Sequence, residues 1–282
     1  MVWNSGCWRQ FDRSHYRRNF EERAERRSLK TIKFLTKLLF PGACPICGEV
    51  QEQCVTGEDA ARICPSCEKM VRRVAQPFCL KCGKPLGRSG GRREYCSDCV
   101  RKKHLFVQGR AVFVYAGVAR GMYRMKYGNR RDFAVTFARE AYEALGDWIR
   151  YVQPQALIPV PLHPARRRKR GYNQAELLAR ELSKLTGIPM ERGLVKRRIN
   201  TSPQKELNVA ERKNNLKNAF QISKNSVHLI KVLLIDDIYT TGSTVDAVAK
   251  TLMLAGIEKV YVLCICIGGD DQGGFNYGSE NL

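Results

Sequence analysis

Residues 232–244 read VLLIDDIYTTGST, and this stretch decides the fold of the chain. Four apolar residues precede two adjacent carboxylates, and small hydroxylated residues around a glycine follow. A helical pattern then covers residues 243–254 and is ended by Gly256. Apolar strand, glycine loop and helix in this order are typical of open parallel α/β sheets. We therefore predict an α/β domain whose ligand lies beyond the carboxyl end of this strand.

The polar part of the same stretch predicts the ligand. Asp236 and Asp237 are placed to accept hydrogen bonds from ribose hydroxyls and to bind the magnesium that accompanies a pyrophosphate. An acidic strand end before an ordinary helix cap is the plainer explanation. The ordered combination is more specific than that and differs from a P-loop, so it indicates a phosphoribosyl-pyrophosphate site. Because backbone N–H groups at a helix N-terminus attract phosphate, we expect the 5′-phosphate to be held by Thr240, Thr241, Gly242, Ser243 and Thr244.

Further strands and helices alternate through the C-terminal half. We predict strands at residues 156–160, at Leu194 and Val195, and at residues 260–267, with a helix over residues 175–186. Repeated alternation of this kind indicates a parallel sheet that helices cover on both faces. Asn173 and Gln174 stand where they could cap the helix rather than contact a ligand.

The cysteines concentrate before residue 100, where eight of them form four C-x2-C pairs. Two such pairs supply the four thiolates of a tetrahedral zinc site, and a glycine after the second cysteine favours the tight turn. Because four thiolates leave no open position for water, we expect the zinc to be structural. Cys7, Cys54, Cys264 and Cys266 are excluded. The predicted ligands are Cys44, Cys47, Cys64, Cys67, Cys79, Cys82, Cys96 and Cys99.

Two other uses of the cysteines are disfavoured. An iron-sulfur cluster usually shows three closely spaced cysteines, and a cytoplasmic chain disfavours disulfides. The spacing leaves open whether there are one or two zinc ions, and whether successive or alternate pairs share a metal.

Composition and charge describe the rest of the chain. A hydrophobic content of 44% is ordinary for globular proteins, whereas the net charge of +22 favours polyanionic partners such as nucleic acid, nucleotides or anionic lipid. No apolar stretch is long enough to span a bilayer, and no signal peptide is recognisable. We expect a soluble, cytoplasmic protein without stable membrane insertion. At its N-terminus we expect disorder to about Ser28, followed by a short amphipathic helix through Ile32, Leu35, Leu38 and Leu39.

Three further segments carry a resemblance to a known family. Residues 157–174, LIPVPLHPARRRKRGYNQ, combine a strand with a dense cationic run and an Arg-Gly-aromatic-Asn-Gln signature. With the zinc pairs and residues 232–244, they resemble the ComF family of competence-associated, phosphoribosyltransferase-like proteins from about residue 35 onward. Residues that resemble the family's flexible loop and the segment leading into its domain are Thr201, Gln204, Arg212, Asn215, Tyr115, Tyr123, Lys126 and Tyr127.

The resemblance implies two modules and a site. The modules are a double zinc-finger module at residues 41–104 and a type I phosphoribosyltransferase-like domain at residues 105–282. Before them we expect a basic extension with a short helix at residues 1–40, whose first 28 or so residues have no counterpart in the family. The signature places Arg170 on the pyrophosphate. Asp236 and Asp237 would serve the reaction, in which an unidentified acceptor attacks the ribose of magnesium-bound phosphoribosyl pyrophosphate.

The same resemblance implies a role in DNA uptake and natural transformation. One alternative is a non-catalytic competence factor that binds single-stranded DNA beside a helicase-like partner. A second is a regulator that senses phosphoribosyl pyrophosphate. Neither the acceptor nor the retention of catalysis follows from the residues.

Overall fold

The computed structural model describes residues 42–51, 62–87, 93–197, 219–223 and 228–268. Contacts divide the chain into two compact units, Met1–Ala43 with Val50–Ala60, and Cys44–Glu49 with Ala61–Leu282. All sites below belong to the second unit. The predicted N-terminal helix and the expected loop residues between 201 and 215 lie outside the described residues, and the boundaries after residues 40 and 104 stay predictions.

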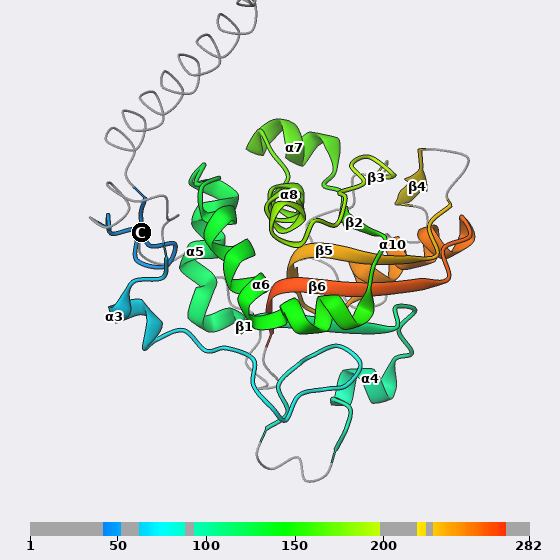
Figure 1. The fold of residues 1–282 in the computed structure, drawn as a ribbon, viewed down its shortest axis with the longest axis horizontal. Helices are drawn as coiled ribbons and strands as arrows, with labels where there is room; N and C mark the ends of the chain where they lie inside the picture. Colours follow the sequence, from blue (N-terminus) through cyan, green and yellow to red (C-terminus); the bar gives the residue numbers. More distant parts are fainter. Residues whose placement is uncertain (1–41, 52–61, 88–92, 198–218, 224–227, 269–282) are drawn as a thin grey trace, which may run out of the picture. The chain divides into compact units, whose positions relative to one another are not determined.

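Four parallel strands form the sheet of the second unit (Figure 1), in the order β1-β6-β5-β2. The predicted strands are confirmed as β2, β5 and β6, and β5 runs on through both aspartates to Tyr239. The sequence pattern does not predict a strand where β1 lies. The strand bounds are β1 Gln108–Val114, β2 Ala156–Pro159, β5 Lys231–Tyr239 and β6 Lys259–Ile267.

The strand predicted at Leu194 and Val195 exists but does not join this sheet. It is β3 (Val195–Arg197), which pairs antiparallel with β4 (Phe220–Ile222) in a sheet of two strands. A strand of three residues is too short for its sequence pattern to show which sheet it joins.

Helices cover both faces of the parallel sheet, as predicted. Because side chains alternate along a strand, Leu233 and Ile235 of β5 face one core and Val232 and Leu234 face the other. The first core contains residues of α5 (Tyr115–Tyr127), α6 (Phe133–Val152) and α8 (Gln174–Thr186). The second contains residues of α10 (Ser243–Leu254). The fold class expected from the sequence is therefore confirmed.

Local sequence explains where the helices begin and end. The side chain of Asn173 caps α8 by accepting a hydrogen bond from the Ala175 amide, and Gly187 ends that helix with φ +73°. The cationic run forms the short helix α7 (Pro164–Arg170), which His163 caps and Gly171 ends. Two single-turn helices, α3 (Pro65–Glu68) and α4 (Ser97–Arg101), begin directly after Cys64 and Cys96. Across the described ranges, every helix is too short or too polar to cross a membrane.

Candidate functional site

The eight predicted cysteine ligands form two separate clusters. In each cluster four sulfur atoms lie within 4.8 Å of one another, and each cluster uses two successive C-x2-C pairs. The spacing of the cysteines left open how many sites form and which pairs share one. In the structure, successive pairs share a site, and two sites form. The clusters are Cys44, Cys47, Cys64 and Cys67, and Cys79, Cys82, Cys96 and Cys99.

The surroundings of these sulfurs fit zinc. The amides of Ile46 and Cys64 each donate to the sulfur of Cys44 at 3.4 Å, and Gly48 and Gly83 adopt the left-handed conformation expected after the second cysteine. Burial opposes ionisation of Cys44, but these and other backbone hydrogen bonds outweigh it and lower the pKa of the thiol to about 7. Four thiolates would hold a structural zinc and stabilise the fold.

Each cysteine cluster is part of one core of the domain. Cys44, Cys64 and Cys67 pack in the same core as Met122 of α5 and Phe137 of α6. The other cluster packs in the core that contains α10. A side chain at Gly121 of α5 would come within 2.5 Å of the Pro45 carbonyl oxygen, so the first cluster and α5 are in close backbone contact. We infer that zinc binding and the stability of the sheet domain depend on each other.

The predicted phosphate loop joins β5 to α10. Gly242 occupies the N-cap position of α10 with φ +71°, a conformation that glycine adopts without strain. Glycine has no side chain that could accept hydrogen bonds from the N–H groups of the first helical turn. Gly242 therefore leaves those donors to other partners. The hydroxyls of Thr241 and Ser243 lie 2.9 Å apart. A helix N-terminus of this kind, placed after a strand and a glycine loop, is an arrangement at which anionic phosphate can bind.

The two aspartates differ in their surroundings. Asp237 makes an ion pair of 2.7 Å with Lys126 of α5. Desolvation, followed by the charge of Asp237, raises the pKa of Asp236 to about 8, although the Asp237 amide donates to its carboxylate at 2.9 Å. Two adjacent carboxylates thus remain at the strand end because one is paired and the other favours its protonated form.

Helix α5 also contacts Arg170 of α7. The Arg170 guanidinium donates to the Tyr127 hydroxyl at 3.0 Å and lies over the Tyr127 ring at 4.8 Å. Tyr127 directly follows Lys126, so neighbouring residues of α5 hold Asp237 and Arg170. Within the rest of the cationic run, Arg167 pairs with Glu176 of α8 at 3.4 Å and His163 serves as a helix cap. The ion pair with Lys126 had not been anticipated from the sequence.

The sequence also did not indicate a buried polar cluster beside the loop. His104 contacts Asp246, which lies in the first turn of α10, and also Tyr239 at the end of β5. No spacing rule joins these residues, because His104 and Asp246 are 142 positions apart.

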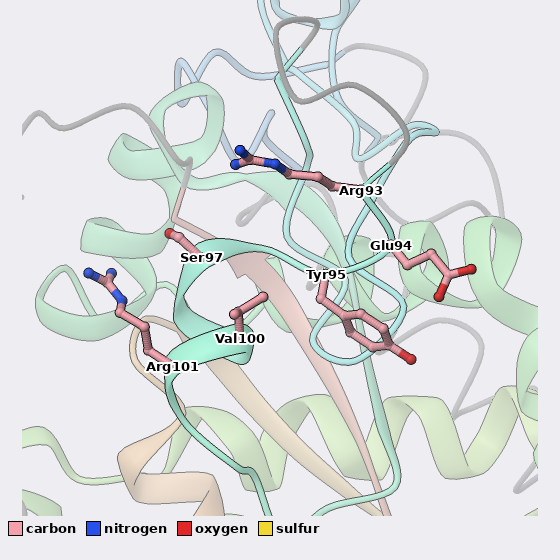
Figure 2. Close-up of a pocket in the computed structure, with 6 residues that line it drawn as sticks. All are labelled: Arg93, Glu94, Tyr95, Ser97, Val100 and Arg101. Carbon is pink, nitrogen blue, oxygen red and sulfur yellow. The ribbon is translucent and has the colours of Figure 1, made fainter.

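A hollow of about 460 Å³ lies elsewhere, on the second zinc-binding region (Figure 2). Its lining residues flank Cys96 and Cys99, and none of them belongs to the phosphate loop. The residues are Arg93, Glu94, Tyr95, Ser97, Val100 and Arg101.

Comparison with known proteins identifies the N-terminal part. Residues 35–100 match the family described as a double zinc ribbon domain, which agrees with the two clusters. Among solved structures, a purine phosphoribosyltransferase from Pyrococcus horikoshii covers 46% of this chain and 72% of its own, at 18% identity and a TM-score of 0.31. That likeness is too slight to carry an argument.

Curated relatives cover most of the chain. The chain is 29% identical to the DNA utilization protein YhgH of Salmonella typhi over 81% of its length and 98% of the relative. It is 28% identical to competence protein ComFC of Bacillus subtilis over 69% of its length and 79% of the relative. With competence protein F of Haemophilus influenzae it shares 35% identity over 71% of its length and 88% of the relative. The chain therefore belongs to the ComF family of competence proteins.

Proposed function

We propose that this protein binds phosphoribosyl pyrophosphate with magnesium and acts as a phosphoribosyltransferase-like protein in DNA uptake or utilization. The observation that carries the proposal is the strand β5 with Asp236 and Asp237 at its end, followed by a glycine loop that opens α10. In a parallel sheet this edge is where ligands bind. The names of the relatives, which refer to competence and DNA utilization, support the biological role.

Each part of the site has a task in this proposal. The N–H groups of residues 240–244 bind the 5′-phosphate, and the two carboxylates accept hydrogen bonds from the ribose hydroxyls. Magnesium would neutralise charge on the pyrophosphate, and carboxylate oxygens such as those of Asp236 and Asp237 suit it chemically. Arg170 supplies positive charge for the pyrophosphate.

The reaction that such a site supports is a displacement at C1 of the ribose. The bond between C1 and the pyrophosphate oxygen breaks, and the electron pair leaves with pyrophosphate. A lone pair of the acceptor then forms the new bond to C1, and the acceptor releases its proton. Because positive charge develops on the ribose, nearby carboxylates stabilise the transition state. The acceptor is not assigned.

The first test of the proposal is calorimetric titration of the zinc-loaded protein with phosphoribosyl pyrophosphate and magnesium. Ribose 5-phosphate and pyrophosphate serve as matched fragments of the ligand. Because the whole ligand engages both the loop and the cationic residues, we expect it to bind at least about tenfold more tightly than either fragment. If neither the whole ligand nor its fragments bind, the proposed site is wrong.

A second candidate function is binding of single-stranded DNA, favoured by the net charge of +22 and by the relatives named for DNA utilization. In this role the protein would act beside a helicase-like partner. If about six phosphates are contacted, affinity should fall about three-hundredfold between about 50 and 200 mM salt. Fluorescence anisotropy with a labelled oligonucleotide measures this fall, and an affinity that does not depend on salt would contradict charge-driven binding.

The two functions can be separated with one variant. Replacing Asp236 and Asp237 with asparagine removes negative charge, so binding of DNA should persist or strengthen while binding of phosphoribosyl pyrophosphate is lost. A sensor of phosphoribosyl pyrophosphate would bind the ligand without releasing pyrophosphate in the presence of any acceptor. Measuring pyrophosphate release therefore distinguishes an enzyme from a regulator.

A further inference from the structure

The segment Lys102–Val107, here called the strap, leads from the last cysteine ligand toward β1 and lies against the phosphate loop. His104 is 4% exposed, and its Nδ1 donates to Asp246 Oδ2 at 2.9 Å. When Nδ1 carries the proton of a neutral ring, Nε2 is a hydrogen-bond acceptor. The Tyr239 hydroxyl lies 3.4 Å from this Nε2 atom. The Leu105 amide donates to the other Asp246 oxygen at 3.1 Å. Both carboxylate oxygens of Asp246 are therefore bound to the strap.

Lys102 adds contacts with the loop itself. Its ammonium group lies 2.7 Å from Asp246 Oδ2 and donates to the Thr241 carbonyl at 3.3 Å. A carboxylate in the first turn of α10 would otherwise repel an anionic ligand at the same helix end. Pairing with Lys102 reduces that repulsion, so the strap affects the charge of the loop as well as its shape.

The strap also limits the conformations open to Gly242. A Cβ atom added to Gly242 would lie 2.4 Å from the Tyr239 hydroxyl and 2.9 Å from His104 Cε1. The backbone of the loop is thus in direct contact with the His104 and Tyr239 side chains. A change in the position of His104 would leave a void beside the glycine on which the turn depends.

The other end of these contacts is the second zinc site. Lys81, which lies between the ligands Cys79 and Cys82, donates to the Phe106 and Val107 carbonyls. Its own carbonyl accepts from the Gly109 amide at 2.7 Å. The strap is therefore attached to the zinc turn on one side and to the phosphate loop on the other.

We propose that His104 and Lys102 are positioning residues that hold the phosphate loop in its binding conformation, and that through them the second zinc site is coupled to ligand binding. The inference rests on the proposed function for the identity of the ligand, but the ordering of the loop does not depend on it. Coupling between sites is reciprocal, so a bound phosphate ligand should also protect the second zinc.

Four variants of the full-length, zinc-loaded chain test the proposal. His104→Leu removes both ring nitrogens, whereas His104→Asn keeps an N–H group that can donate to Asp246. Lys102→Met removes the charge that contacts the loop. Lys103→Met removes the same charge from the exposed neighbouring position and serves as the matched control.

The readout is hydrogen exchange, without added ligand, of the Leu105 amide, which donates to Asp246 Oδ1, and of the Asp246 amide, which donates to the Gly242 carbonyl. We expect at least about tenfold faster exchange in His104→Leu and Lys102→Met, wild-type exchange in Lys103→Met, and recovery in His104→Asn. Unchanged exchange in folded Lys102→Met and His104→Leu proteins would overturn the proposal. Lys102 is partly exposed, so its variant provides the test even if His104→Leu does not fold.

Ligand binding and zinc release give a second readout. If the wild type binds phosphoribosyl pyrophosphate, Lys102→Met should bind it about tenfold more weakly, and the ligand should slow chelator extraction of one zinc ion only in the wild type. Equal affinity and equal protection in both proteins would overturn the coupling. Failure of the wild type to bind would instead refute the proposed function, and the exchange result would still decide the role of the strap.

Discussion

Replacing both Cys44 and Cys47 with serine is expected to remove one of two zinc ions. It should also unfold the sheet domain, so its effect should not be confined to an N-terminal module. The first cysteine cluster packs in the core that α5 and α6 share with β5. Structural zinc sites contribute on the order of 10 kcal/mol in isolated zinc fingers, whereas whole domains are stable by about 5–15 kcal/mol. Loss of one site therefore removes a large share of the stability of the domain.

Zinc content by mass spectrometry and thermal unfolding by circular dichroism measure this effect. The wild type should contain two zinc ions per chain. Cys54→Ser is the matched control, because Cys54 lies away from ligand spacing, and it should keep both ions and the wild-type melting temperature. Two zinc ions and an unchanged melting temperature in the Cys44/Cys47 variant would contradict the assignment of the first site.

The Asp236→Asn substitution is expected to weaken ligand binding and to stabilise the folded protein. In the ligand complex, magnesium and the ribose hydroxyls would favour the ionised form of Asp236. A hydrogen bond to a charged group contributes about 1.5–3 kcal/mol, so affinity should fall at least about tenfold. Its raised pKa has the opposite effect on folding, since the unfolded chain ionises Asp236 more readily than the folded chain does.

The dependence of stability on pH follows from the sign of this shift. Below the ordinary pKa of 3.8 the carboxyl group is protonated in both states, and it does not oppose folding. As the pH rises from there to about 8, the unfolded state loses its proton first, and wild-type stability falls. Asp236→Asn should therefore exceed the wild type by on the order of 5 kcal/mol at pH 8 and by less than about 1 kcal/mol at pH 4.

Urea unfolding at several pH values measures the difference. Asp147→Asn is the matched control, because Asp147 is an aspartate whose side chain is 96% accessible, and its substitution should change stability little. A wild type that is more stable than Asp236→Asn at pH 8 would show that the carboxylate of Asp236 is not destabilising in the folded protein.

Features specified by neighbouring residues could be predicted from the sequence. The strand, loop and helix of residues 232–254 follow from local pattern, and the N-cap at Asn173 was recognised as one alternative. The zinc ligands follow from the fixed spacing of cysteines in tight turns. In these cases the physical cause lies within a few residues of the pattern.

Features that depend on contacts between distant residues could not be predicted. The pairing of cysteine turns, the ion pair of Lys126 with Asp237 and the contact of His104 with Asp246 all arise from how the chain packs. The strand at Val195 illustrates the same limit, because its type was predicted but its partner β4 was not. The sequence does not reveal strand β1 because its first three residues, Gln108, Gly109 and Arg110, interrupt the apolar pattern of a buried strand.

We expect Asp236, Asp237 and the loop of residues 240–244 to bind phosphoribosyl pyrophosphate. The most direct measurement is calorimetric titration of zinc-loaded wild type and of the Asp236→Asn, Asp237→Asn double variant with phosphoribosyl pyrophosphate and magnesium. We predict saturable binding by the wild type and an affinity at least about a hundredfold lower in the variant. Equal affinity in the two proteins, or no binding by a wild type that holds two zinc ions, would contradict the claim.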